Sequence, residues 1–186
     1  MTLDGLVEEM RAATRAEADA RGIVARLVRP AAALALDPAL LRPEYLVCDA
    51  AQGNGIHLLH EEADHSLAVF VISWLPGRGV PPHDHGTWAI VAGMVGTETN
   101  VFWRRRDDGT IPGRAELVES GRRTFGPGEV VSFLPEDIHS VANEGREISV
   151  SLHLYGRHLN HTGRSRFDPE AGTVEPYIVR IEPGSS

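Results

Sequence analysis

Two histidines separated by one residue, His83 and His85, constrain this chain most, together with a third histidine, His139, much later in the sequence. Residues two apart on a β-strand point to the same face, so His83 and His85 are predicted to direct their imidazoles at one point while Asp84 faces away. Neutral imidazole binds iron, zinc, copper or nickel at roughly 2.0–2.2 Å. A barrel wraps distant segments around one interior and can bring His139 to the same point. The three histidines therefore predict a metal site inside a small β-barrel.

The segments around these histidines resemble the two sequence motifs of the cupin superfamily. Residues 77–85 read Gly-Arg-Gly-Val-Pro-Pro-His-Asp-His and residues 88–96 read Trp-Ala-Ile-Val-Ala-Gly-Met-Val-Gly, which matches a glycine, a His-x-His pair and a second glycine. In residues 128–143 a glycine, Pro135, His139 and Asn143 follow one another as in the second motif, with one residue fewer between Pro135 and His139. The resemblance implies a mainly β protein, a cupin double-stranded β-helix or jelly-roll barrel preceded by short N-terminal α-helices.

The first motif lacks a carboxylate ligand. Most cupins carry a metal-binding glutamate a few residues after His-x-His, but residues 86–91 read Gly-Thr-Trp-Ala-Ile-Val, and the next carboxylate is Glu98. Three neutral ligands leave a divalent ion its full charge. Such a centre is expected to favour an anionic ligand in its open positions, a thiolate above all.

A polar strand face is predicted near the end of the barrel. Alternation over residues 151–155 places Ser151, His153 and Tyr155 on one face, with Leu152 and Leu154 on the other. Buried polar groups require hydrogen-bond partners. We therefore expect a hydrogen-bonded chain from Ser151 through His153 to Tyr155, with the phenol oriented toward the barrel interior.

Three features together resemble the cysteine dioxygenase family of thiol dioxygenases. They are His-Asp-His, a third histidine followed four residues later by asparagine, and Ser-Leu-His-Leu-Tyr. The similarity covers about residues 54–155. It implies a cupin barrel that binds iron(II) through three histidines and converts a thiol and O2 to a sulfinate. The implied metal ligands are His83, His85 and His139, and the implied Ser-His-Tyr triad is Ser151, His153 and Tyr155.

The substrate-binding positions depart from the general family pattern. Ile56 stands where the family places an arginine or glutamine that anchors the substrate carboxylate. The sequence is more similar to the 3-mercaptopropionate dioxygenase subgroup at His57, at the two leucines after it, and at Gly156. That subgroup also has an arginine beyond the triad tyrosine, and Arg164 lies at a similar spacing with Arg166 close by. We expect an anionic mercapto acid or a cysteine-like thiol as substrate, with Arg164 as the best anchor and Arg166 and His57 behind it.

Two further positions near the histidines bear on the site. Trp88 is a candidate to line the substrate pocket, with core packing as the alternative. Some cysteine dioxygenases have a cysteine after His-x-His that is cross-linked to the triad tyrosine. Here Ala89 or Ile90 occupies that place, and the single cysteine, Cys48, lies well upstream, so no cross-link is expected.

Composition limits the classes of function. A chain of 186 residues with 42% hydrophobic residues suits one domain, 1–186. The net charge of −8 argues against nucleic acid as a partner, and no apolar run approaches the roughly 20 residues of a membrane helix. One cysteine and an N-terminus without signal-peptide features predict a cytoplasmic protein. A monomer or small homo-oligomer is expected, although no sequence feature fixes the oligomeric state.

The chain divides into a helical part, 1–45, packed on a barrel, 55–181. Apolar residues recur at helical spacing from Leu3 to Met10, and Pro30, Pro38 and Pro43 are predicted to punctuate a second and a third short helix. Beyond residue 57 the period changes to two and β-branched residues increase. The expected strands are 67–74, 88–95, 97–105, 115–124, 129–133, 140–142, 148–155 and 174–181.

Two alternatives remain open. A three-imidazole site accepts metals other than iron, so another metal-dependent cupin enzyme, an isomerase or a carbon dioxygenase, is the first. A non-enzymatic ligand-binding cupin is the second. The triad distinguishes thiol oxidation from both, because other cupins do not need Ser151, His153 and Tyr155.

Overall fold

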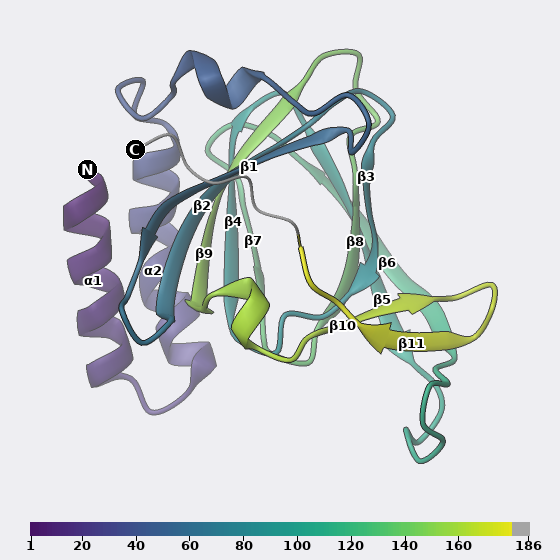
Figure 1. Ribbon diagram of the computed structural model, residues 1–186. Coiled ribbons are helices and arrows are strands. Elements are labelled where there is room, and N and C mark those ends of the chain that lie inside the picture. The colour runs from purple at the N-terminus through teal and green to yellow at the C-terminus, as the bar shows by residue number, and fades with distance from the viewer. Residues whose placement is uncertain (180–186) are drawn as a thin grey trace.

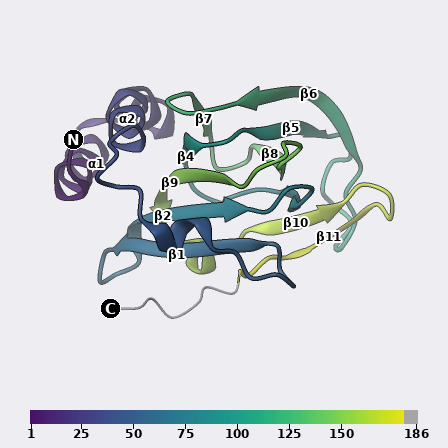
Figure 2. The same cartoon turned by 90° about the horizontal axis from the view of Figure 1, so that it is seen from above.

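The computed structural model describes residues 1–179 and contains two facing antiparallel β-sheets, with two helices packed on the outside of one sheet (Figure 1, Figure 2). In chain order the elements are α1 (Leu3–Ala16), α2 (Ala20–Ala35), the 3-10 helix η1 (Pro43–Leu46), β1 (Asn54–Glu61), β2 (Ser66–Trp74), β3 (Gly79–His83), β4 (Ala89–Val95), β5 (Glu98–Arg105), β6 (Leu117–Phe125), β7 (Val130–Phe133), β8 (Ile138–Ala142), β9 (Ser149–Arg157), the 3-10 helix η2 (Leu159–His161), β10 (Ser165–Asp168) and β11 (Thr173–Pro176).

The order of strands within the sheets defines the fold class. One sheet has the order β1-β2-β9-β4-β7, and the other has the order β11-β10-β3-β8-β5-β6. From β2 to β10 the chain therefore passes back and forth between the two sheets, apart from the hairpin β5-β6, which stays in one sheet. This alternation is that of a double-stranded β-helix, or jelly roll, and the fold predicted from the sequence is confirmed.

The five-stranded sheet has two different apolar faces. Its outer face packs against α1 and α2 in a cluster that includes the fully buried Leu6, Leu27, Leu152 and Leu154. Its inner face belongs to a second cluster within the barrel, which includes Phe70 and, from β7, Phe133. Neighbouring residues of β9 therefore serve different layers, as the alternation of residues 151–155 predicted.

The helical part differs from the prediction at Pro30. This residue lies inside α2 instead of ending a helix. Asp19 caps α2 by accepting a hydrogen bond from the Gly22 amide at 2.9 Å, and the buried stripe of Leu27 and Leu34 continues across Pro30. Burial of that stripe outweighs the one backbone hydrogen bond that proline cannot donate. The third helix is a single 3-10 turn, η1, whose buried residue is Tyr45.

The expected strands between residues 67 and 155 are present, with ends displaced by one or two residues. The final expected strand, 174–181, is shorter in the structure: β11 ends at Pro176, residues 177–179 lie outside any strand, and the last two positions lie outside the described residues. The expected set lacked β1, β3 and β10, because β3 contains Pro81 and Pro82 and β10 spans four residues. Within residues 1–179, neither helix combines the length and the apolar character needed to cross a membrane.

Candidate metal centre

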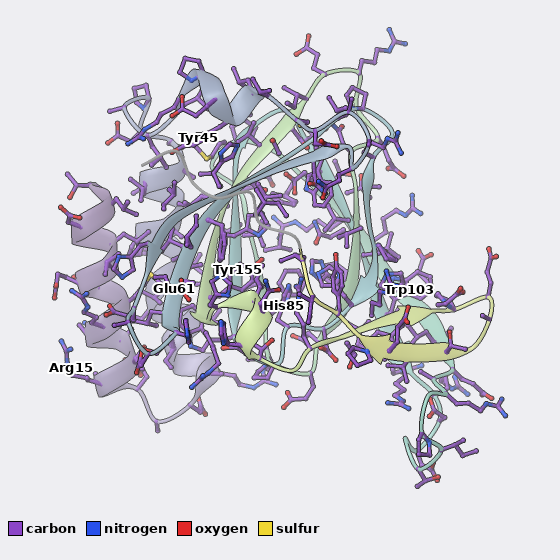
Figure 3. All side chains as sticks on the ribbon, viewed as in Figure 1. Arg15, Tyr45, Glu61, His85, Trp103 and Tyr155 are labelled. Carbon is purple, nitrogen blue, oxygen red and sulfur yellow. The ribbon has the colours of Figure 1, made fainter. Side chains whose placement is uncertain are left out.

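The three histidines meet between the two sheets. His83 is the last residue of β3, His85 follows it, and His139 lies on β8. All three are buried, and their ligand nitrogens lie within 4.8 Å of one another. Nε2 of His85 and Nε2 of His139 are 3.3 Å apart. Figure 3 shows His85 beside Tyr155 in the interior of the barrel.

His83 and His85 do not share one strand, contrary to the prediction. The strand ends at His83 because Asp84 bonds to Ser165: its amide donates to the Ser165 carbonyl at 3.2 Å, and its Oδ1 accepts from the Ser165 amide at 2.9 Å. Gly86 then takes a left-handed conformation, with φ of 61°. The two imidazoles still converge, and Asp84 faces away from them as expected.

Two of the histidines are oriented by their second ring nitrogen. Nδ1 of His83 donates to the Pro81 carbonyl at 2.9 Å, and Nδ1 of His139 donates to Oδ1 of Asn100 at 2.6 Å. These bonds leave the Nε2 lone pair of each ring for a metal ion. Asn100 was not predicted, because nothing in the sequence of β5 singles it out from the polar residues Glu98 and Thr99 beside it.

Burial keeps the three imidazoles neutral. Desolvation lowers the pKa of His83 to about 3 and holds the pKa values of His85 and His139 well below 6.5. Neutral imidazole is the form that binds a metal. Nitrogens 3.3 Å apart can both reach one ion at about 2.1 Å. The residues present therefore fit a divalent metal ion held by His83, His85 and His139.

The chain of polar residues on β9 is continuous. Oγ of Ser151 lies 2.8 Å from Nε2 of His153, and Nδ1 of His153 lies 2.8 Å from the Tyr155 hydroxyl. Sequence analysis missed a fourth member, Glu98 of β5, whose Oε1 accepts from Ser151 at 2.7 Å. β9 is flanked by β2 and β4, so this row lies in the middle of its sheet.

A cavity of about 300 Å³ lies between the three histidines and the Tyr155 end of this polar row. The three histidines, His153, Tyr155 and Arg164 line it, and Ile56, Ile72 and Leu159 add an apolar wall. Arg164 is 4% exposed, and its Cζ lies 4.2 Å from the centre of the Tyr177 ring. Its Nε finds no hydrogen-bond partner within residues 1–179, and burial lowers its pKa. Tyr177 was not predicted, since nothing in the local sequence marks it.

Three residues predicted to bind substrate lie outside this cavity. His57 follows the cavity residue Ile56 on β1, so it faces the opposite side and packs near Tyr45, with ring centroids 5.0 Å apart. Trp88 belongs to the core beneath the helices. Arg166 is half-exposed and its Nε donates to Glu175 at 2.7 Å. Their spacing in the sequence predicted that these residues share the cavity with Arg164, but strand alternation and tertiary packing place them outside it.

Cys48 lies away from the triad tyrosine. Its Sγ is 3.3 Å from the Ser73 hydroxyl, whereas the residue paired with Tyr155 on β4 is Ala89. The asparagine of the second motif is structural: Nδ2 of Asn143 donates to the carbonyls of Trp74 and Glu147. It thereby ties the turn after β8 to the end of β2.

No protein-family model matches this sequence. Among solved structures, the chain is similar to the cupin domain of an XRE family transcriptional regulator from Enterobacter cloacae, with 19% identity and a TM-score of 0.41 over 57% of this chain and 99% of that chain. It is also similar to a conserved protein with a double-stranded β-helix domain from Klebsiella pneumoniae, with 13% identity and a TM-score of 0.48 over 70% of this chain and 92% of that chain. An oxalate oxidase in complex with glycolate matches with 18% identity and a TM-score of 0.47 over 65% of this chain and 61% of that chain. These neighbours include cupin-domain proteins.

Proposed function

We propose that this protein is a cytoplasmic, iron(II)-dependent thiol dioxygenase that oxidises a small-molecule thiol with O2 to its sulfinate. The supporting observation is one cavity lined by three buried, neutral imidazoles, the phenol of Tyr155 and the guanidinium of Arg164. The overall reaction is RSH + O2 → RSO2⁻ + H⁺, so both oxygen atoms end on sulfur. Iron(II) held by His83, His85 and His139 supplies the activation of O2 and favours the thiolate form of the substrate.

Arg164 is the anchor for an anionic substrate. A carboxylate in a dry cavity needs a charged partner, and a guanidinium binds it through two parallel hydrogen bonds. Among residues 1–179 the buried Nε of Arg164 has no hydrogen-bond partner, and its guanidinium stacks over the ring of Tyr177. The apolar wall of Ile56 and Ile72 suits a short carbon chain between sulfur and carboxylate. A mercapto acid such as 3-mercaptopropionate fits this arrangement better than L-cysteine, because no acidic residue among 1–179 lines the cavity to pair with its ammonium group.

Tyr155 places a hydroxyl at the reacting end of the cavity. The hydrogen bond with His153 holds the phenol oxygen in place, so it can bond to the substrate without moving. Pre-oriented donors of this kind stabilise developing charge by a few kcal/mol. An isomerase or a carbon dioxygenase has no need of this row of residues, which favours thiol oxidation over the alternative metal-dependent reactions.

The proposal is tested by aerobic incubation of iron-loaded protein with cysteine, cysteamine, 3-mercaptopropionate and mercaptosuccinate. O2 uptake and sulfinate formation are measured together, and one mole of each per mole of thiol consumed is expected for a mercapto acid. The His139→Ala variant is the control for free iron. Disulfide formation in place of sulfinate, or equal rates with the variant, would reject the proposal.

A further inference from the structure

Glu98 extends the Ser151-His153-Tyr155 row across the barrel. It lies on β5, in the six-stranded sheet, whereas the other three residues lie on β9 in the five-stranded sheet. The successive separations from Glu98 Oε1 to Ser151, His153 and Tyr155 are 2.7, 2.8 and 2.8 Å, and all four side chains are buried. The cavity wall at Tyr155 is thus connected to a carboxyl group that does not line the cavity.

This chain of hydrogen bonds has two possible directions. When Glu98 is a carboxylate it accepts from Ser151, Ser151 accepts from Nε2–H of His153, and Nδ1 of His153 accepts from the Tyr155 hydroxyl. When Glu98 is a carboxylic acid every bond reverses: His153 carries its proton on Nδ1, and the Tyr155 hydroxyl is free to donate into the cavity. The tautomer of His153 therefore follows the protonation state of Glu98.

Within this hydrogen-bonded row, only Glu98 can gain or lose a charge near neutral pH. Burial lowers the pKa of His153 to about 3 and raises the pKa of Tyr155 above its ordinary value. Burial also raises the pKa of Glu98, to about 7, against the opposing hydrogen bond from Ser151. A proton that enters at Tyr155 is therefore stable only when it reaches Glu98.

The surroundings of Glu98 are neutral in the part of the chain that the structure describes. Its β-sheet partner on β6 is Phe125, and Asn100 follows on its own strand. The nearby charged groups Arg123 and Glu144 lie on the exposed face, where they bond to Glu129 and Thr99 respectively. The ionisable groups on the inner side are His153 and Tyr155, with Arg164 and His83 lowering the pKa of His153 from the cavity side.

We propose that Glu98 is the remote acceptor for the proton of the substrate thiol, which reaches it through Tyr155, His153 and Ser151. The S–H bond breaks and its proton passes to the Tyr155 oxygen; the tyrosine proton passes to Nδ1 of His153; the Nε2 proton passes to Ser151; and the serine proton passes to Oε1 of Glu98. The three middle residues stay neutral, Glu98 becomes the acid, and the substrate becomes a thiolate. The reversed chain then points the Tyr155 hydroxyl at the sulfur anion. The thiol in this step rests on the proposed function; the coupling of Glu98 to His153 does not.

The coupling is tested by NMR of metal-free protein with ¹⁵N-labelled histidine, recorded between pH 5 and pH 9. The His153 signals are assigned by their loss in His153→Gln. The proton of His153 is expected on Nδ1 at low pH and on Nε2 at high pH, with the change near pH 7. Glu98→Gln and Ser151→Ala should each abolish the change, whereas Glu144→Gln, which alters an exposed glutamate near β5, should leave it intact. A single tautomer throughout in the wild-type protein, or a change that survives Glu98→Gln, would overturn the proposal.

The transfer step is tested by the pH dependence of kcat/KM for 3-mercaptopropionate. Below pH 6 wild type and Glu98→Gln should react at similar rates, because neither has a carboxylate at position 98. Above pH 8 the wild type should be faster by on the order of 100-fold. A constant ratio across this range contradicts proton transfer to Glu98. Absence of thiol oxidation in the wild type, with the tautomer change present, would instead refute the proposed reaction while leaving the coupling established.

Discussion

At the scale of single residues, Asn100 orients one histidine of the candidate metal site. Its Oδ1 accepts a hydrogen bond from Nδ1–H of His139, which leaves Nε2 of that ring to face the cavity. Loss of such a partner typically weakens metal binding about 10- to 100-fold. We expect Asn100→Ala to lower the affinity for Zn²⁺ or anaerobic Fe²⁺ by this factor in competition with a chelator. Ser140→Ala, on the same strand as His139 but bonded to Trp103, is the matched control and should bind metal normally.

Variants of Arg164 and Arg166 test whether the substrate carboxylate binds to Arg164 inside the cavity or only responds to positive charge nearby. Arg164→Ala should raise KM for mercapto acids and lower kcat/KM about 10- to 100-fold, because a charged hydrogen bond is lost, and should leave cysteamine almost unaffected. Arg166→Ala removes an equal charge outside the cavity and should change neither substrate. Initial rates with both thiols provide the measurement. If Arg164→Ala slows both thiols equally, the carboxylate is not bound by this residue.

Tyr155 and His153 are expected to act as one unit. Tyr155→Phe should retain bound iron and slow turnover by on the order of 100-fold, since one oriented hydroxyl is deleted from a packed strand. His153→Ala should have a similar effect, and the double variant should be little slower than either single variant. Single-turnover rates with iron-loaded proteins provide the comparison. Independent, multiplicative losses would show that the two residues do not act through the same phenol.

At the scale of elements, β9 combines a polar inner face with an apolar outer face. Leu152 is fully buried between β9 and the helices, on the side of the sheet opposite His153. Leu152→Ala should lower the free energy of unfolding by about 2–5 kcal/mol, measured by urea denaturation, because it leaves a cavity at this interface. The inner face is unchanged, so activity per folded molecule should be retained. Loss of activity without loss of stability would mean that the two faces are coupled.

The same strand shows what sequence patterns determine. Alternation predicted both faces of β9, because the direction of each side chain on a strand depends only on its position in a two-residue repeat. The two cupin-like motifs located the three histidines. Three features of the site do not follow from such patterns. The bend at Asp84 depends on its hydrogen bonds to Ser165, and the path of the chain after η2 places Arg164 in the cavity but leaves Arg166 outside, bonded to Glu175. Tyr177, which follows β11, contributes because its ring packs against Arg164. Each of these is a contact that the local period does not encode: Asp84 and Ser165 are 81 residues apart, and the other contacts depend on how the chain after η2 folds back on itself. Pro30 within α2 has the same origin, since the buried helix face overrides the local preference.

At the scale of the whole molecule, Glu98 makes stability depend on pH. Its pKa rises from 4.5 in the unfolded chain to about 7 in the fold, so the folded protein binds more protons between these values and loses stability as the pH rises through this range. The full loss is about 3 kcal/mol at pH 8. In the metal-free protein, Glu98→Gln should therefore be more stable than wild type at pH 8, with the advantage gone at pH 4.5. Urea denaturation at both pH values tests this, and an equal difference at both would exclude a role for ionisation.

The three tryptophans of the chain occupy three different environments. Trp74 lines the cavity with the histidines, Trp88 packs beneath the helices, and Trp103 donates its indole N–H to Ser140 on the six-stranded sheet. Figure 3 shows Trp103 well away from His85 and Tyr155. Because Trp74 shares the cavity with the histidine cluster, a bound open-shell ion is expected to quench its emission more strongly than that of Trp88 or Trp103. Tryptophan fluorescence should then report metal loading without substrate, label or turnover.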